Sequence, residues 1–381
     1  MAEVAYAKGL EGIIAAESAI SRIDGQAGRL TYRGFPIEEL AEYSDFEEVT
    51  YLLLYEKLPN GNEMEAFRRA MRASRGISAP ILEMVRTFPI GAHPMELLQS
   101  VMAYLSGYVE HKIQHSATCN CRQTLHQVVQ IATVVAAYNR LREGEQFVPP
   151  RMDLSHGANF LYMLRGKEPE PYEGEIMDRC LVLHAEHGFN ASTFTARVVA
   201  STLSTCYSSI SAAMGALYGS LHGGANERVM AMVDEIGTRA NAERWVNDAL
   251  DNHKKIMGMG HREYKVKDPR ANSIESMLRT LSEKKGDARY YDILKEVERV
   301  FRARMETTGK PIYPNVDFFS GAVYSLLGIP KQLFTPVFAI ARVSGWLAHV
   351  LEQRVGNRIF RPESLYTGPD VREYVPIEER E

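Results

Sequence analysis

Apolar residues recur at helical spacing along most of the chain, with polar residues on the opposite face of each segment. A short alternating stretch at 28–34 predicts a strand or hairpin arm. The pattern thus predicts an all-α fold with little sheet. Helices are expected over 36–55, 63–74, 79–88, 94–111, 124–144, 297–309 and 336–353.

Residues 191–221 are rich in Ala, Ser, Thr and Gly, which let helices approach closely. They predict one tightly packed central helix or two in series. After Gly223 and Gly224 the composition becomes charged, as expected of a smaller and more exposed domain, and Gly and Pro return near 318–330. We therefore predict a large domain from 1–221 and 325–381 and a small domain from 222–324.

The overall composition favours a globular protein with two domains, because 381 residues exceed one ordinary core and 45% of them are hydrophobic. A net charge of −4 gives no general attraction to nucleic acid or to an acidic membrane surface. The N-terminus lacks a signal-peptide pattern, and the most apolar run contains Arg342. We expect a cytoplasmic protein without a membrane span.

Five residues near the middle of the chain could suggest a metal site: His111, His115, Cys119, Cys121 and His126. The first three could share a helix face, but the set does not match a standard zinc spacing. Buried thiols and surface histidines explain it better, and we expect no metal.

Two histidines lie beside glycines. In 183–193, His184 and His187 flank Glu186, and Asn190 or Ser192 could cap the following helix. This arrangement fits either an anion-binding helix start or a capped helix with one packed histidine. In "LHGGAN", His222 precedes Gly223–Gly224, which fits either an ordinary helix end or a catalytic histidine at a hinge.

The segment 254–270 carries six basic residues against two acidic ones. Gly258 and Gly260 precede His261 there and would let the backbone approach a ligand closely. The charge contrast with the acidic chain indicates a small polyanionic ligand. A solvated basic loop is the alternative.

The segment "YPNVDFFSG" contains Asp317 between Val316 and two phenylalanines, Phe318 and Phe319. Apolar neighbours would raise the pKa of this carboxyl group towards that of a useful general base. An aspartate that caps the next helix is the alternative. Arg342 lies in an otherwise apolar helix, where an arginine is rarely without an anionic partner.

Taken together and in this order, "HAEHGFNAST", "LHGGAN", "GMGHREYKVKDPR", "YPNVDFFSG", "ARVSGW" and "NRIFRP" resemble the citrate synthase family. The resemblance extends from about residue 9 to 368. It implies a helical homodimer in which each chain has a large and a small domain, with an active-site cleft between them. In such a fold the small domain carries CoA and rotates to close the cleft.

The resemblance also implies the reaction, a condensation of acetyl-CoA with oxaloacetate and water to give citrate and CoA. Asp317 would be the base that removes a methyl proton. His222, as a neutral donor, would stabilise the enolate oxygen, and His261 would polarise the ketone of oxaloacetate.

The remaining implied contacts concern the two substrates. Oxaloacetate would be held by His187, Arg270, Arg342 and Arg361, the last reaching into the partner subunit's site. CoA would contact Lys255, Met257, Gly258, Met259, Gly260 and Lys265. Asn190, Ser192 and Asn315 would support the substrate-contacting residues. Neither a metal nor a cofactor is implied, since the CoA thioester is a substrate.

Three alternatives stay open. A 2-methylcitrate synthase would use propionyl-CoA, alone or beside acetyl-CoA, in a pocket shaped by Phe189, Phe318 and Phe319; one methylene changes binding by only about 1–3 kcal/mol. A non-catalytic helical dimer would be expected to lack Asp317 or a histidine. A metal-dependent hydrolase would use His184, His187 and the His/Cys set, but the zinc spacing is missing.

Overall fold

The computed structural model describes residues 6–108, 121–309 and 311–380. In these ranges the fold is helical apart from one three-stranded antiparallel sheet near the N-terminus, in the order β1(Ser21–Asp24), β2(Arg29–Tyr32), β3(Phe35–Pro36). Leu30 and Tyr32 of β2 are buried while Arg29 and Thr31 are not, which is the alternation that predicts a strand at 28–34. The predicted all-α class is confirmed.

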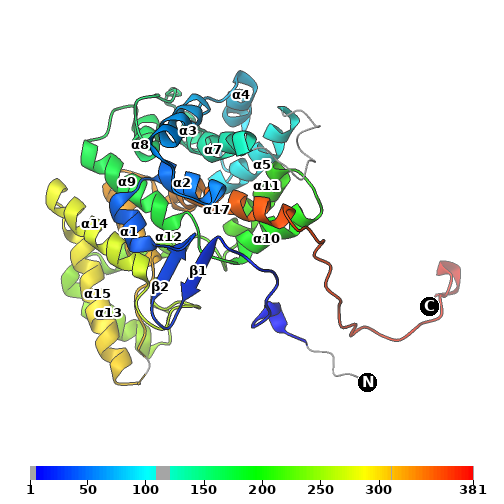
Figure 1. Ribbon diagram of the computed structural model, residues 1–381. Helices are drawn as coiled ribbons and strands as arrows, with labels where there is room; N and C mark the ends of the chain where they lie inside the picture. Colours follow the sequence, from blue (N-terminus) through cyan, green and yellow to red (C-terminus); the bar gives the residue numbers. More distant parts are fainter. Residues whose placement is uncertain (1–5, 109–120, 310, 381) are drawn as a thin grey trace.

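The first helices form the larger part of the molecule (Figure 1). They are α1(Ile37–Tyr43), α2(Phe46–Tyr55), α3(Gly61–Ala73), α4(Ala79–Thr87), α5(Pro94–Leu105), α7(Cys121–Arg142), α8(His156–Arg165), α9(Pro171–His184), α10(Ala191–Ser201) and α11(Cys206–Tyr218). Short 3-10 turns lie at Lys8–Leu10, Ser106–Tyr108, Lys331–Leu333 and Ile377–Glu379.

Two segments with a helical pattern each form two helices, separated by a capping residue. The pattern at 36–55 forms α1 and α2, because the Asp45 side chain accepts a hydrogen bond from the backbone N–H of Glu48 at 2.8 Å and starts a new helix. The small-residue segment 191–221 forms two helices in series, because Thr205 caps α11 in the same way through the N–H of Ser208 at 3.0 Å. The α10 and α11 helices pack directly on each other.

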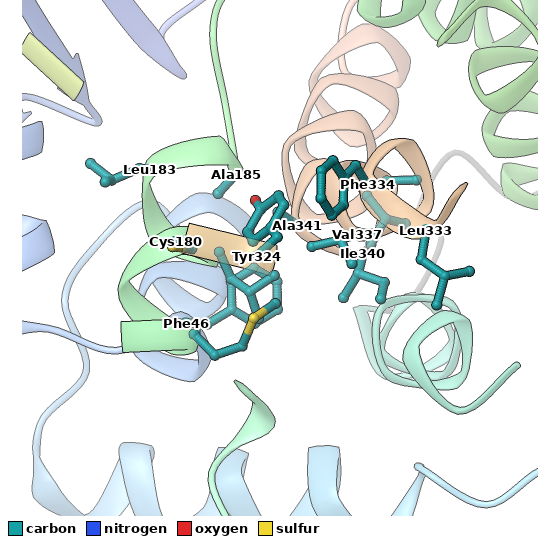
Figure 2. Packing of buried hydrophobic residues seen from close by; sticks show 14 of the residues in the cluster. Phe46, Cys180, Leu183, Ala185, Tyr324, Leu333, Phe334, Val337, Ile340 and Ala341 are labelled. Atoms are coloured by element: carbon teal, nitrogen blue, oxygen red, sulfur yellow. The ribbon is translucent and has the colours of Figure 1, made fainter. Parts of the chain in front are cut away.

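Helix α17(Phe334–Arg354) is the centre of the core. It packs against α2, α5, α7, α9, α10 and α11, and Figure 2 shows Phe334, Val337, Ile340 and Ala341 of this helix among buried residues of other elements. The helix with its preceding turn is long and apolar enough to cross a membrane, but 94% of its apolar window is buried inside the protein. In the described part of the chain, α17 is therefore a helix of the protein core.

A second group of helices contains α12(Ala225–Ile236), α13(Arg239–Asp251), α14(Pro269–Lys285), α15(Arg289–Glu306) and α16(Asp317–Leu326). These helices pack on one another, and they meet the larger group through α14 against α1 and α9 and through α12 against α17. In Figure 1, α13, α14 and α15 lie on the side away from α3, α4 and α7. The group lies within residues 225–326 and so overlaps the predicted small domain at 222–324; the division into two domains and the movement of one of them remain predictions.

Candidate active site

One cavity of about 630 Å³ lies between the two helix groups. It is lined by residues from 183–193, "LHGGAN", 254–270, "YPNVDFFSG" and "ARVSGW", but by none from "NRIFRP". Its wall includes His187, Asn190, His222, His261, Arg270, Asp317 and Arg342. The cluster unites three histidines, one carboxylate and two arginines from distant parts of the chain.

His222 lies in the turn between α11 and α12, and its hydrogen bonds fix its tautomer. The backbone N–H of Ser192 donates to Nε2 of His222 at 3.2 Å, and the Ser192 hydroxyl lies 2.8 Å from the same nitrogen. Because Nε2 accepts a bond, a neutral ring carries its proton on Nδ1. Burial, helped by the charge of Arg342, lowers the pKa of His222 to about 4. The ring is therefore a neutral donor at pH 7.

Ser192 and Asn190 hold this histidine from the start of α10. Asn190, and not Ser192, is the N-cap, because its side chain accepts from the N–H of Thr193 at 3.1 Å. The Ser192 hydroxyl lies 2.8 Å from Oδ1 of Asn190 and accepts a hydrogen bond from Nε1 of Trp346 at 3.2 Å. Asn190 and Ser192 therefore contact each other at the start of α10, and the support expected of them for the substrate-contacting residues remains a prediction.

Each of the two glycines after His222 is required for a different steric reason. Gly224 has φ +71° and is the N-cap of α12, and α11 has already ended at Tyr218, so this glycine starts a helix and does not terminate one. At Gly223, a Cβ atom would lie 2.2 Å from the carbonyl oxygen of Leu217 and 3.1 Å from Cγ2 of Thr335. The glycines therefore allow the close turn that brings the His222 ring to the cavity, and a hinge here remains a prediction.

His261 has the opposite tautomer. Its Nδ1 accepts from the backbone N–H groups of Glu263 at 3.0 Å and Tyr264 at 3.4 Å, so the neutral ring carries its proton on Nε2. Burial and the charge of Arg270 lower the pKa of His261 to about 4. His261 thus offers a neutral Nε2–H donor.

His187 lies beside His261, with the ring centroids 5.2 Å apart. Its Nε2 lies 3.1 Å from the Tyr264 hydroxyl. Burial, together with the charge of Arg270, holds the pKa of His187 well below its usual range. All three histidines of the cavity are therefore uncharged near neutral pH.

The loop that leads to His261 is bound to the segment that leads to Asp317. The N–H of Gly260 donates to the carbonyl of Tyr313 at 2.8 Å, and the N–H and side-chain amide of Asn315 donate to the carbonyls of Gly258 at 2.9 Å and Gly260 at 2.8 Å. Gly258 has φ +78°, and a Cβ there would lie 2.8 Å from Cα of Phe318. Position 258 therefore requires glycine because the backbone packs against Phe318. The sequence analysis had suggested a different reason, a close approach of the backbone to a ligand.

Asp317 is the first residue of α16 and lines the cavity. Its N–H donates to the side chain of Asn315 at 2.9 Å. Burial raises the pKa of Asp317 to about 6, against the opposing charge of Arg270. The direction agrees with the sequence prediction, and the buried neighbours Val316 and Phe318 supply the apolar surroundings.

The two arginines are both buried but are held differently. Arg270 makes two hydrogen bonds with Asp268, at 3.0 and 2.8 Å, and although burial opposes its charge, this carboxylate raises the pKa of the guanidinium. Arg342 donates through Nε to the carbonyl of His184 at 2.7 Å and lies 4.5 Å from the Phe338 ring centroid. Burial lowers the pKa of Arg342 to about 10, so it remains charged at pH 7. The cavity therefore favours an anion.

The structure does not bring Arg361 to this cavity. Arg361 lies exposed on the extended segment that follows α17 (Figure 1) and lines a separate hollow of about 1020 Å³, with residues such as Leu10, Ile13 and Phe194. That hollow is larger, but its wall contains none of the three cavity histidines or Asp317. A role for Arg361 in the partner's site stays a prediction.

None of the residues expected to contact CoA lines this cavity. Lys265 and Gly260 line a hollow of about 290 Å³, Lys255 is exposed, and Met257 is half-buried. Met259 pairs with Pro314 in an isolated β-bridge. Two further lysines of the basic segment form ion pairs, Lys267 with Glu275 at 2.5 Å and Lys254 with Glu235 at 2.9 Å.

The structure places the side chains that the alternative functions invoked. Phe318 and Phe319 are fully buried and do not line the cavity, whereas Phe189 does. His184 is buried behind the cavity with Nδ1 2.7 Å from the carbonyl of Cys180, so it is a packed histidine.

The His/Cys set falls mainly outside the described residues, which exclude His111, His115 and Cys119. Of Cys121 only the helical backbone is described, and His126 is exposed on α7. Within the described part of the chain, no group of three or more His, Cys, Asp or Glu side chains could hold a metal ion.

Sequence reasoning missed several residues of the site. Phe338, Thr335, Arg262 and Glu263 line the cavity, and Tyr264 bonds to His187. For Phe338 a signal exists, since it lies one helical turn before Arg342 on the same helix. Thr335 lies in the first turn of α17, and the others lie in the turn after His261, where spacing alone does not predict the direction of a side chain.

Known proteins resemble the chain over nearly its whole length. Residues 9–363 match the family model described as citrate synthase, C-terminal domain. The citrate synthase of Deinococcus radiodurans is 47% identical, over 98% of this chain and 99% of that protein. The crystal structure of citrate synthase from Pyrobaculum aerophilum is 42% identical, covers 98% of this chain and 95% of that one, and has a TM-score of 0.93.

A third relative is the citrate synthase of Thermoplasma acidophilum, solved as a ternary complex with carboxymethyl coenzyme A and oxaloacetate. It is 34% identical, covers 98% of this chain and 99% of that one, and has a TM-score of 0.91. The chain belongs to the citrate synthase family.

Proposed function

We propose that this chain condenses acetyl-CoA with oxaloacetate and water to give citrate and CoA. The observation that carries the proposal is one cavity in which Asp317, with its raised pKa, faces two neutral histidines of opposite tautomer. A thioester methyl group is a weak acid, so its deprotonation needs both a base and a donor for the enolate oxygen. The ligands named for the Thermoplasma acidophilum structure agree with this chemistry.

Oxaloacetate binds first to the positive end of the cavity. Arg270 and Arg342 bind its carboxylates, since planar guanidinium groups suit bidentate contacts, and His187 adds a neutral donor. His261 donates its Nε2–H to the ketone oxygen. This bond draws electron density from the carbonyl carbon that will be attacked.

The condensation then takes three steps. Asp317 removes a methyl proton from acetyl-CoA while the Nδ1–H of His222 donates to the thioester oxygen, where negative charge develops. The enolate carbon attacks the ketone carbon of oxaloacetate, and the new alkoxide takes up a proton at the His261 side. Water then cleaves the citryl thioester and releases citrate and CoA.

The CoA contacts, assembly and location complete the proposal. CoA runs along Lys255, Met257, Gly258, Met259 and Gly260, with Lys265 near a phosphate. Two copies form a homodimer, each chain closes its small domain over the cavity, and Arg361 reaches the partner's site. The enzyme needs no cofactor or metal and acts in the cytoplasm.

Activity should fall at acidic pH with the protonation of Asp317. The base works only as a carboxylate, and its pKa is raised to about 6. We expect kcat/KM for acetyl-CoA to be flat above this pKa and to fall about tenfold per pH unit well below it. The pKa values of His222 and His261, both about 4, leave these rings neutral in the same range. If kcat/KM began to fall only near pH 4, the result would contradict the assignment of Asp317 as the titrating base.

Mixed dimers should test the contribution of Arg361. Arg361→Ala and Asp317→Asn proteins are each expected to be nearly inactive. After subunit exchange, each hybrid dimer has one site with both residues intact, so roughly a quarter of wild-type activity should return. If native mass spectrometry confirms exchange and no activity returns, Arg361 does not act across the dimer.

Product analysis with the two acyl-CoA substrates distinguishes a citrate synthase from a 2-methylcitrate synthase. Acetyl-CoA with oxaloacetate should give citrate and free CoA in equal amounts, identified by mass. We expect kcat/KM for acetyl-CoA to exceed that for propionyl-CoA. The reverse order would assign the enzyme to 2-methylcitrate synthesis on the same catalytic residues.

A further inference from the structure

The tip of the β1–β2 hairpin, residues 25–28, lies against the turn at 263–266 that follows His261. The N–H of Lys265 donates to the carbonyl of Gly25 at 2.9 Å. A Cβ atom on Gly25 would lie 2.1 Å from the carbonyl oxygen of Glu263 and 2.8 Å from its carbon. The two backbones are therefore in direct contact, and only glycine fits at this position.

A second contact lies at the other end of the tip. Gly28 has φ +63°, and a Cβ there would lie 2.6 Å from Cγ2 of Val266. The N–H of Ala27 donates to the Asp24 side chain at 2.9 Å, which gives the tip a defined shape. The tip is thus an ordered surface that fits the turn at two points.

The same turn sets the orientation of two cavity histidines. Its N–H groups at Glu263 and Tyr264 are the donors that fix the ring of His261, and its Tyr264 hydroxyl contacts His187. The hairpin belongs to the predicted large domain and the turn to the predicted small one. Displacement of the tip would therefore move both rings relative to Arg342 and the rest of the cavity.

We propose that the hairpin tip at 25–28 is a positioning element for the reaction, holding the 263–266 turn so that His261 presents its Nε2–H to the ketone of oxaloacetate. The proposal rests on the function proposed above. The tip touches no reacting atom and acts only through the turn. Its contribution should appear in steps that involve oxaloacetate, and much less in the affinity for acetyl-CoA.

Gly25→Ala tests the backbone contact, with Gly76→Ala as its control. Neither glycine has a positive φ, and a Cβ on Gly76 meets nothing within 4 Å. We expect Gly25→Ala to lower kcat/KM for oxaloacetate roughly tenfold to a hundredfold, with KM for acetyl-CoA nearly unchanged. Hydrogen exchange of the 261–267 peptide should become faster in this variant. Gly76→Ala should match the wild type in both measurements.

A second set of variants separates the contact from backbone strain. Gly28→Ala adds both a positive-φ penalty and a clash with Val266, whereas Gly286→Ala has nearly the same φ, +66°, and meets nothing within 4 Å. Val266→Ala removes the clashing atom. Activity should fall in Gly28→Ala, stay normal in Gly286→Ala, and be largely restored in the Gly28→Ala/Val266→Ala double variant.

Two results would overturn the proposal: wild-type kinetics and exchange in folded Gly25→Ala, or no recovery in the double variant. If Gly25→Ala fails to fold, the Gly28 and Val266 set decides alone. If the wild-type protein itself releases no CoA with oxaloacetate, the proposed function fails, and the hydrogen-exchange result still reports whether the tip holds the turn.

Discussion

Asp317→Asn is expected to lower kcat roughly a thousandfold, because a positioned general base contributes about 10² to 10⁴ to a proton transfer. The amide has the size of the carboxyl group but cannot accept the methyl proton. Oxaloacetate should still bind, since Arg270 and Arg342 are untouched. Steady-state kinetics with acetyl-CoA and calorimetric titration with oxaloacetate measure the two quantities separately.

Asp248→Asn serves as the matched control, because Asp248 is exposed on α13 and far in sequence from the cavity segments. It should keep wild-type kcat and thermal stability. A kcat within a few-fold of wild type in folded Asp317→Asn would remove Asp317 from the role of base. Loss of oxaloacetate binding would instead assign it to the substrate site.

His222→Ala is expected to lower kcat by roughly 10²- to 10³-fold, the usual cost of removing one donor to a developing oxyanion. The Nδ1–H of His222 is the donor in question, fixed by the bond from the Ser192 backbone to Nε2. Because the ring is neutral, its loss should lower kcat but should not change the fall in activity at acidic pH that is assigned to Asp317. A kcat measurement across pH tests both statements.

His126→Ala is the control for this variant, since His126 is exposed on α7. It should behave as wild type. If His222→Ala abolished the acidic limb while keeping the plateau rate, the titrating group would be His222 and the division of roles between it and Asp317 would be wrong.

The sequence predicts the fold well where periodicity is strong. The helical class and the strand near residue 30 follow from spacing alone. Helix breaks follow less well: at Asp45 and Thr205 a capping side chain interrupts a pattern that is otherwise continuous. Such a residue is compatible with either structure until the packing around it is known.

The motifs named residues that the structure brings to one cavity, but they did not predict the geometry. The residues that line it are His187, His222, His261, Asp317, Arg270 and Arg342, whereas Arg361 and the expected CoA contacts lie elsewhere, and the roles of all of them remain predictions. The tautomers of His222 and His261 could not be predicted, because they depend on backbone donors in Ser192 and Glu263.

The steric requirement for glycine at position 258 and the hairpin contact at Gly25 also could not be predicted from the sequence. Both depend on which backbone lies opposite a missing Cβ, and that follows only from the tertiary structure.

The most direct test of the central claim is the release of free CoA thiol from acetyl-CoA with and without oxaloacetate. The account predicts release that depends on oxaloacetate, because the enolate formed by Asp317 needs the bound ketone as its acceptor. Release at the same rate without oxaloacetate would indicate a simple thioesterase. No release in either case would contradict the proposed condensation.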